Sequence, residues 1–173
     1  MHLRLIAAMG SLVIGCAGAQ AQSAKPNDAQ IAHIAYTAGQ IDIKAAQRAL
    51  EKSKNKEVRT FAEDMVRDHK AVNEQALALV KKLNVTPEDN DTSKALMKQA
   101  AEKQASLQKL SGAAFDKAYA DNEVAYHKAV DSALQDTLIP SASNAELKTL
   151  LSTGLKIFQG HEQHAEHVAQ SLG

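Results

Sequence analysis

The chain has 173 residues, with 45% hydrophobic residues, only 3% aromatic residues and no tryptophan. Its 20 basic and 20 acidic residues cancel, so it has no basic field that would attract nucleic acid. The length suits one domain, and an apolar content carried mainly by alanine, leucine and valine favours closely packed helices over a β-sandwich.

Residues 1–21 are typical of a signal peptide for export. A short start with one arginine precedes an apolar stretch, Leu5 to Gly15, which is too short to span a bilayer. Cleavage after Ala19-Gln20-Ala21 would leave one helical domain, residues 22–173. No later stretch is apolar enough to cross a membrane, so we expect a protein of the periplasm or outer membrane of a Gram-negative bacterium.

A second interpretation of the N-terminus stays open. The run Val13-Ile14-Gly15-Cys16 is similar to a lipoprotein cleavage site, so residues 1–15 would be the signal and Cys16 the lipidated N-terminus, anchored in the outer membrane. Cys16 is the only cysteine, so the folded domain can have neither a disulfide nor a thiolate ligand.

From residue 27 onward, apolar residues recur at steps of three and four, which predicts amphipathic helices. The first helix is expected from a cap at Asn27 or Asp28 to about Ser53. After a short break at residues 54–56, the second helix is expected to reach about Asn84. The shortness of this break predicts that the two helices pack antiparallel.

A loop over residues 85–92 should lead to a weaker helix over residues 93–110, capped by Asp91 or Thr92. The remaining long helices are expected from about Ala113 to Leu138 and from about Ala145 to Leu172, with a loop at residues 140–144 between them. The predicted fold is therefore all-α: an antiparallel four-helix bundle with an additional connecting helix.

Each of the four long helices carries one metal-binding side chain on or near its inward face. These residues are Asp42, His69, His127 and His161. His69 shows the pattern best, because it follows Met65 by four residues and precedes Val72 by three, within one apolar stripe. A buried polar group without a partner costs about 1–3 kcal/mol, so each of these residues needs a partner.

Three imidazoles and one carboxylate suit Zn²⁺ or Cu²⁺, and Fe or Mn less well. Asp68, Glu123 and His164 are predicted to orient the ligating histidines, since a ligating histidine usually donates its other N–H to a partner. Glu123, one turn before His127, could also be a ligand itself. Counting along the helices, at 1.5 Å per residue, predicts that His161 lies about one turn from the layer of the other ligands. Tyr119 and Tyr126 should pack in the core with their hydroxyl groups on polar partners.

Three segments together resemble a bacterial exported family called domain of unknown function 4142. They are EVRTFAEDMVRDHKAVNE (57–74), LSGAAFDKAYADNEVAYHKAV (110–130) and the final helix with His161. The resemblance covers roughly residues 27–172 and implies a ferritin-like four-helix bundle and an exported or outer-membrane protein without established chemistry. The family usually has a glutamate where this chain has Asp42, whose carboxylate reaches one methylene less far.

No catalytic residue is predicted. Carboxylate-bridged di-iron sites use Glu-x-x-His pairs, which the sequence lacks. No serine is placed with a histidine and an acid, so nucleophilic catalysis has no support. Two main hypotheses follow. One is a transition metal bound between the helices. The other is a non-enzymatic envelope protein that binds a partner or lipid and whose buried histidines and aspartate form a structural network. A weaker alternative is pH sensing by the histidines.

Overall fold

A computed structural model of the chain describes residues 25–173, and every regular element within that range is helical. The predicted signal peptide (residues 1–21), its shorter alternative (1–15) and Cys16 lie outside the described residues. The elements are α1 (Asp28–Lys52), α2 (Lys56–Lys82), α3 (Asp91–Gln108), α4 (Gly112–Ala133), a π-helical turn η1 (Leu134–Leu138), α5 (Ile139–Ser141) and α6 (Ala145–Ser171). None of these helices is both long and apolar enough to span a membrane.

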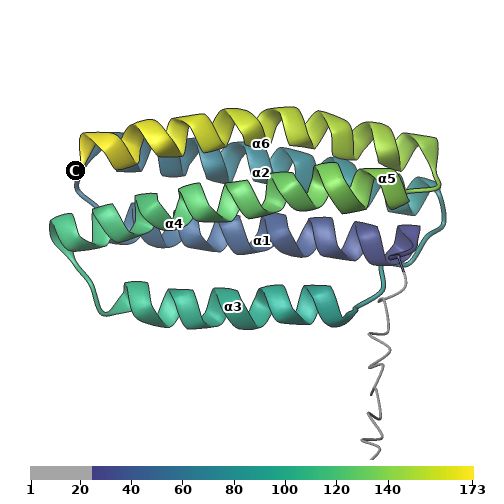
Figure 1. Cartoon of the computed structure of the whole chain (residues 1–173), viewed down its shortest axis with the longest axis horizontal. Helices are drawn as coiled ribbons and strands as arrows, with labels where there is room; N and C mark the ends of the chain where they lie inside the picture. The colour runs from purple at the N-terminus through teal and green to yellow at the C-terminus, as the bar shows by residue number, and fades with distance from the viewer. Residues whose placement is uncertain (1–24) are drawn as a thin grey trace, which may run out of the picture.

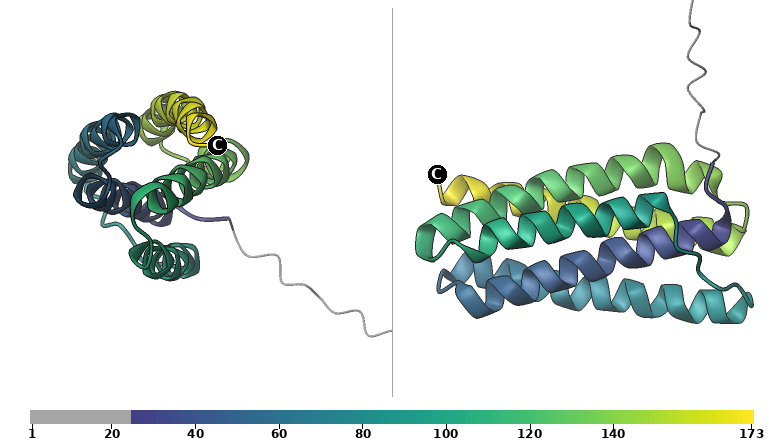
Figure 2. Two further views of the ribbon diagram at one scale, coloured as in Figure 1. Left: turned by 90° about the vertical axis from the view of Figure 1, so that its left-hand side faces the viewer. Right: turned by 90° about the horizontal axis from the view of Figure 1, so that it is seen from below.

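Four long helices, α1, α2, α4 and α6, form a bundle, and α3 packs on its outside against α1 (Figures 1 and 2). α1 and α2 run in opposite directions, as do α4 and α6 (Figure 1). α2 and α4 run in the same direction, because α3 carries the chain back along the length of the bundle before α4 begins (Figure 1). The predicted connecting helix is thus a crossover that spans the whole bundle.

Asparagine begins four of the five long helices, through a side chain that accepts hydrogen bonds from the first turn. The predicted cap of α3, Asp91 or Thr92, was wrong. Asn90 occupies that position: its Oδ1 accepts from the backbone N–H of Ser93 at 3.0 Å, and the Ser93 hydroxyl accepts from the backbone N–H of Asn90 at 3.1 Å. This reciprocal pair satisfies two backbone donors, and the helix begins at Asp91, two residues earlier than predicted.

The loop predicted at residues 140–144 is shorter in the structure, because the helical path continues through η1 and α5 to Ser141. In η1 the backbone N–H of Ile139 bonds to the carbonyl of Leu134, five residues back. Pro140 follows directly and has no N–H to donate. Proline is tolerated in a first helical turn, so the wider turn absorbs the missing bond and the chain stays helical for three more residues.

The apolar core consists of two clusters. One lies where the end of α1 and the start of α2 pack against α4, and it includes Ala49, Phe61 and Tyr119. The other lies at the opposite end of the bundle and includes Ile31 and Leu151. On each of the four bundle helices a buried polar residue falls between these two clusters. The bundle therefore has a polar layer near its middle, with apolar packing on both sides.

Candidate metal centre

The polar layer contains all four predicted ligands, one from each bundle helix. Asp42 lies on α1, His69 on α2, His127 on α4 and His161 on α6, and all four are buried. The ring nitrogens offered by the three histidines lie within 4.8 Å of one another. Asp42, Glu123 and His127 form a second group at the same spacing.

The prediction that His161 lies about one turn from this layer was wrong, since it joins His69 and His127 directly. The error came from the end of α4. Because the helical path continues to Ser141, His127 and His161 lie at nearly equal distances along the chain from the turn that joins α5 to α6. Two antiparallel helices joined by a short turn bring such positions to the same height.

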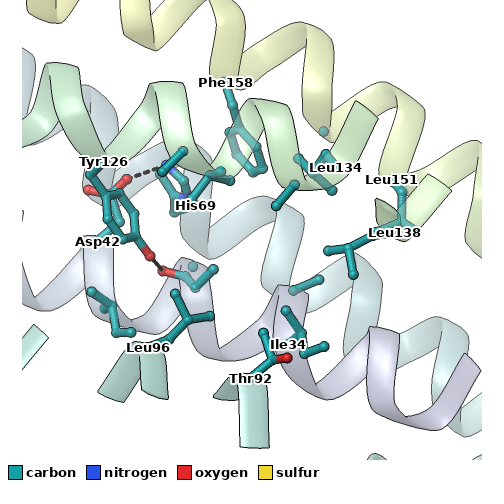
Figure 3. Close-up of a pocket in the computed structure, with 18 of the residues that line it drawn as sticks. Ile34, Asp42, His69, Thr92, Leu96, Tyr126, Leu134, Leu138, Leu151 and Phe158 are labelled. Atoms are coloured by element: carbon teal, nitrogen blue, oxygen red, sulfur yellow. Dashed lines mark hydrogen bonds and ion pairs between the residues drawn. The ribbon is translucent and has the colours of Figure 1, made fainter. Parts of the chain in front are cut away.

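Asp42 faces two of the histidines. Its Oδ2 lies 2.7 Å from His69 Nε2 and 3.3 Å from His127 Nε2, and Figure 3 shows the contact with His69. Neither contact has hydrogen-bond geometry, so both oxygens of Asp42 and both of these Nε2 atoms have no hydrogen-bond partner. The layer therefore concentrates buried polar atoms that the chain itself leaves unsatisfied.

The tautomer of His127 follows from its backbone contact. Nδ1 lies 2.9 Å from the carbonyl oxygen of Glu123, which can only accept, so Nδ1 carries the proton. In the neutral ring the lone pair is then on Nε2, which faces the carboxylate of Asp42 at 3.3 Å. Two acceptors at this distance repel each other, so this contact favours a cation between them.

His161 is held from outside the cluster. Its Nε2 lies 3.1 Å from Asp68 Oδ2, and Arg67 in turn donates to both oxygens of Asp68 at 2.7 and 2.9 Å. Nδ1 of His161 is buried and has no partner. A carboxylate on one nitrogen with the other nitrogen free is the arrangement that orients a histidine toward a metal ion.

The comparison with protein families agrees with the resemblance seen in the sequence. Residues 16–168 match the family described as Domain of unknown function (DUF4142). The chain belongs to this family. Comparisons with curated proteins and with solved structures found no match.

Glu123 lies in the cluster of this DUF4142 protein and not only beside it. Its Oε2 is buried without a hydrogen-bond partner, 4.0 Å from His127 Nδ1. Its backbone carbonyl also contacts His127 Nδ1, but this contact does not involve the Glu123 side chain, for which the orienting role was predicted. Glu123 thus presents a second carboxylate to the cluster, beside Asp42.

The pKa values of the two carboxyl groups move in opposite directions. Burial raises the pKa of Glu123 well above its usual value, and the charge of Asp42 raises it further, so both effects favour the neutral form of Glu123. Burial also acts to raise the pKa of Asp42, but its contacts, of which that with His69 is the strongest, outweigh it and lower the pKa to about 2. Asp42 is therefore the charged carboxylate of the cluster.

Burial also lowers the pKa of two of the histidines. It lowers the pKa of His127, and it lowers that of His161 to about 4, although Asp68 partly opposes the second shift. Both rings are therefore neutral at pH 7. Neutral imidazole is the form that coordinates metal ions.

Other predicted partners lie elsewhere in the DUF4142 fold. Nδ1 of His164 is 3.8 Å from Asp64 Oδ2, and its ring packs edge-on against Phe61, away from the three histidines. The Tyr126 hydroxyl donates to the carbonyl of Ala38 at 2.8 Å, which links α4 to α1 (Figure 3). The hydroxyl of Tyr119 was predicted to reach a polar partner and has none, while its ring packs against Phe61 and Phe115.

One buried polar residue next to the cluster was missed in the sequence. Asn73 is 5% exposed, and its Nδ2 has no hydrogen-bond partner. It follows His69 by four residues, so it lies on the same face of α2, one turn further along. An amide on the inward stripe was the signal that could have found it.

Proposed function

We propose that this protein binds one transition metal ion in the polar layer of its bundle. The proposed ligands are Asp42, His69, His127 and His161. The observation that carries the proposal is the convergence of buried nitrogen and oxygen atoms from four helices that have no hydrogen-bond partner. Each such atom costs about 1–3 kcal/mol if it stays unpaired, and one bound cation would satisfy them together.

The contact between His127 and Asp42 distinguishes this proposal from a purely structural network. In a network, every acceptor faces a donor. Here the unprotonated Nε2 of His127 faces the ionised carboxylate of Asp42 at 3.3 Å, so the two residues would gain nothing from each other without a cation.

The donor set supports a mononuclear centre. His127 belongs to both groups of close ligand atoms but has one free lone pair, so it can serve one ion. Three imidazole nitrogens and one carboxylate suit Zn²⁺ or Cu²⁺ better than Fe or Mn. Glu123 is available as a further oxygen ligand, and Asp68 would orient His161 from behind.

We propose that the fold is ferritin-like in its connectivity. The parallel course of α2 and α4, with α3 as the single long crossover, supports this, because ferritin-like bundles have one such connection (Figure 1). The likeness concerns the path of the chain only. The di-iron ligand pattern is absent from the sequence, so iron storage and iron oxidation are not part of the proposal.

The features of residues 1–21 support the further proposal that the protein is exported. The mature chain would begin at residue 22 or, in the alternative, at a lipidated Cys16 in the outer membrane. The mass of the N-terminal peptide of the purified protein distinguishes the two, because lipidation adds acyl chains to Cys16.

The metal content of the untagged purified protein tests the proposed centre. We expect about one Zn or Cu ion per chain in the wild type, and none in His69→Gln. His164→Gln is the matched control and should keep its metal, because His164 lies outside the cluster. Asp68→Asn should weaken metal affinity roughly 10- to 100-fold, the usual effect of losing a residue that orients a ligand.

The proposal would be refuted if the wild-type protein is metal-free and stays metal-free when it is titrated with Zn²⁺ and Cu²⁺. The histidines would then be assigned to a structural network in a partner-binding bundle. That alternative predicts that His69→Gln unfolds more easily than the wild type even when both are metal-free.

A further inference from the structure

A cavity of about 850 Å³ begins at the metal cluster and extends through the bundle toward η1. Figure 3 shows Asp42 and His69 near one end of it and apolar side chains along the rest. Those apolar side chains include Ile34, Leu134, Leu138, Leu151 and Phe158. This volume lies within the range of about 300–1,000 Å³ that is usual for small-molecule sites, which combine apolar walls with a few convergent polar groups.

The cavity also reaches the outside of the bundle beneath α3. Leu96 and Ala100 line its outer part, together with the exposed Lys103. The hydrogen bond from Tyr126 to the carbonyl of Ala38 joins α4 to α1, and both residues line the cavity.

Asn73 marks the polar end of the cavity. It lines the cavity, is 5% exposed, and leaves Nδ2 without a partner. Its amide packs against Gly39 so closely that a Cβ on Gly39 would lie 2.5 Å from Asn73 Oδ1. Only glycine leaves room for the amide there. A buried donor that no acceptor in the chain satisfies points to an acceptor on a ligand.

We propose that this cavity binds a free fatty acid. The carboxylate head would accept a hydrogen bond from Asn73 Nδ2 beside the metal ion, and the alkyl chain would extend along Phe158 and Leu151. This inference rests on the proposed function, because a bound divalent cation outweighs the charge of Asp42 and makes the polar end attractive to an anion. A head placed instead at Lys103 would leave Asn73 unpaired.

The test is calorimetric titration of the untagged protein with dodecanoate below its micelle concentration, in zinc-loaded and metal-free forms. We expect saturable binding of one dodecanoate per chain, tighter in the zinc-loaded form. Dodecanol, which has the same chain but no charge, should bind the zinc-loaded form at least tenfold more weakly, since hydrogen bonds to charged groups are the stronger ones. Equal affinity for dodecanoate and dodecanol would overturn the proposed carboxylate head.

Two variants test the site of the carboxylate head and the site of the alkyl chain separately. Asn73→Leu should weaken dodecanoate binding roughly tenfold without lowering the melting temperature, because it removes a buried donor that has no partner in the protein. Gly154→Leu should abolish binding by filling the cavity beside Phe158 and Val72. Gly160→Leu is its matched control: the same substitution in the same helix, at an exposed position with open space, should leave binding unchanged.

The outcomes distinguish this inference from the proposed metal centre. Metal binding without saturable dodecanoate binding overturns the fatty-acid site alone. The protein could also take up no metal and yet bind dodecanoate, with this binding abolished in Gly154→Leu. That result refutes the metal centre and establishes the cavity ligand. Loss of binding in Lys103→Gln but not in Asn73→Leu overturns the proposed orientation.

Discussion

Single acidic residues in this bundle differ in charge according to their neighbours. Asp42 is as deeply buried as Glu123, but it faces His69, which favours its ionised form. Glu123 faces the charge of Asp42, which favours its neutral form. Two carboxyl groups in one layer are thus shifted in opposite directions, and the arrangement of charges around each one sets the direction.

Asp131 is a third buried acid, and it allows a prediction on pH dependence. It is 6% exposed, and both of its carboxylate oxygens have no partner. Burial, followed by the negative charge of Glu162, raises its pKa to about 7, compared with 3.8 in the unfolded chain. The folded state therefore binds more protons between these values, and the stability that Asp131 contributes is lost as the pH rises toward 7.

Asp131→Asn should therefore stabilise the protein more at pH 8 than at pH 5. We expect the two gains in unfolding free energy to differ by about 1 kcal/mol or more, allowing for solvent screening of a group near the surface. Urea denaturation at the two pH values measures this. Asp121→Asn, at an exposed position paired with Lys117, is the control and should show no such difference. Equal gains at both pH values would contradict the assignment.

At the scale of elements, helix starts are specified locally. Asn55 accepts hydrogen bonds from the backbone N–H groups of Glu57 and Val58 at 2.9 and 3.2 Å, whereas Ser111, at the start of α4, makes no side-chain bond to its helix. The two caps therefore differ in what they contribute. Capping bonds satisfy donors that a helix cannot satisfy internally.

Asn55→Ala should lower the free energy of unfolding by about 1 kcal/mol, because two backbone donors of α2 lose their acceptor. Ser111→Ala removes no such bond and should cost less than half as much. Urea denaturation of the two variants beside the wild type checks the difference. A larger loss in Ser111→Ala than in Asn55→Ala would show that α4, and not α2, depends on its cap.

For the molecule as a whole, the polar layer between two apolar clusters makes stability depend on pH. His127 and His161 are buried and neutral, and burial lowers the pKa of both below the unfolded value of 6.5. As the pH falls below 6.5 the unfolded chain takes up protons first, so the folded state loses stability. For His161 this loss continues to about pH 4.

We therefore expect the metal-free protein to melt at a lower temperature at pH 5 than at pH 7. The loss is at most about 1.4 kcal/mol per pH unit for each histidine. His161→Gln should reduce the difference between the two pH values, and His164→Gln should leave it unchanged. Bound metal should stabilise the protein by about 2.7 kcal/mol at 100 times its Kd, and less at pH 5, where protons compete for the ligands. Identical melting of the metal-free protein at both pH values would contradict this account.

The sequence alone determined the helical class, the family and the approximate ends of five long helices. It also placed Asp42, His69, His127 and His161 on inward faces. All of these depend on local patterns: apolar residues at steps of three and four, capping residues and short motifs. That these residues bind a metal, and that residues 1–21 direct export, stay predictions for the measurements above.

Only the tertiary structure decided how the inward faces meet. It brought His161 into the layer, placed Glu123 inside the cluster and turned Asn73 toward a cavity between helices. It also made α2 and α4 parallel, through the crossover of α3 (Figure 1). Helical periodicity gives the face on which a side chain lies but not its height in the bundle, and height depends on how the helices are joined and packed against one another.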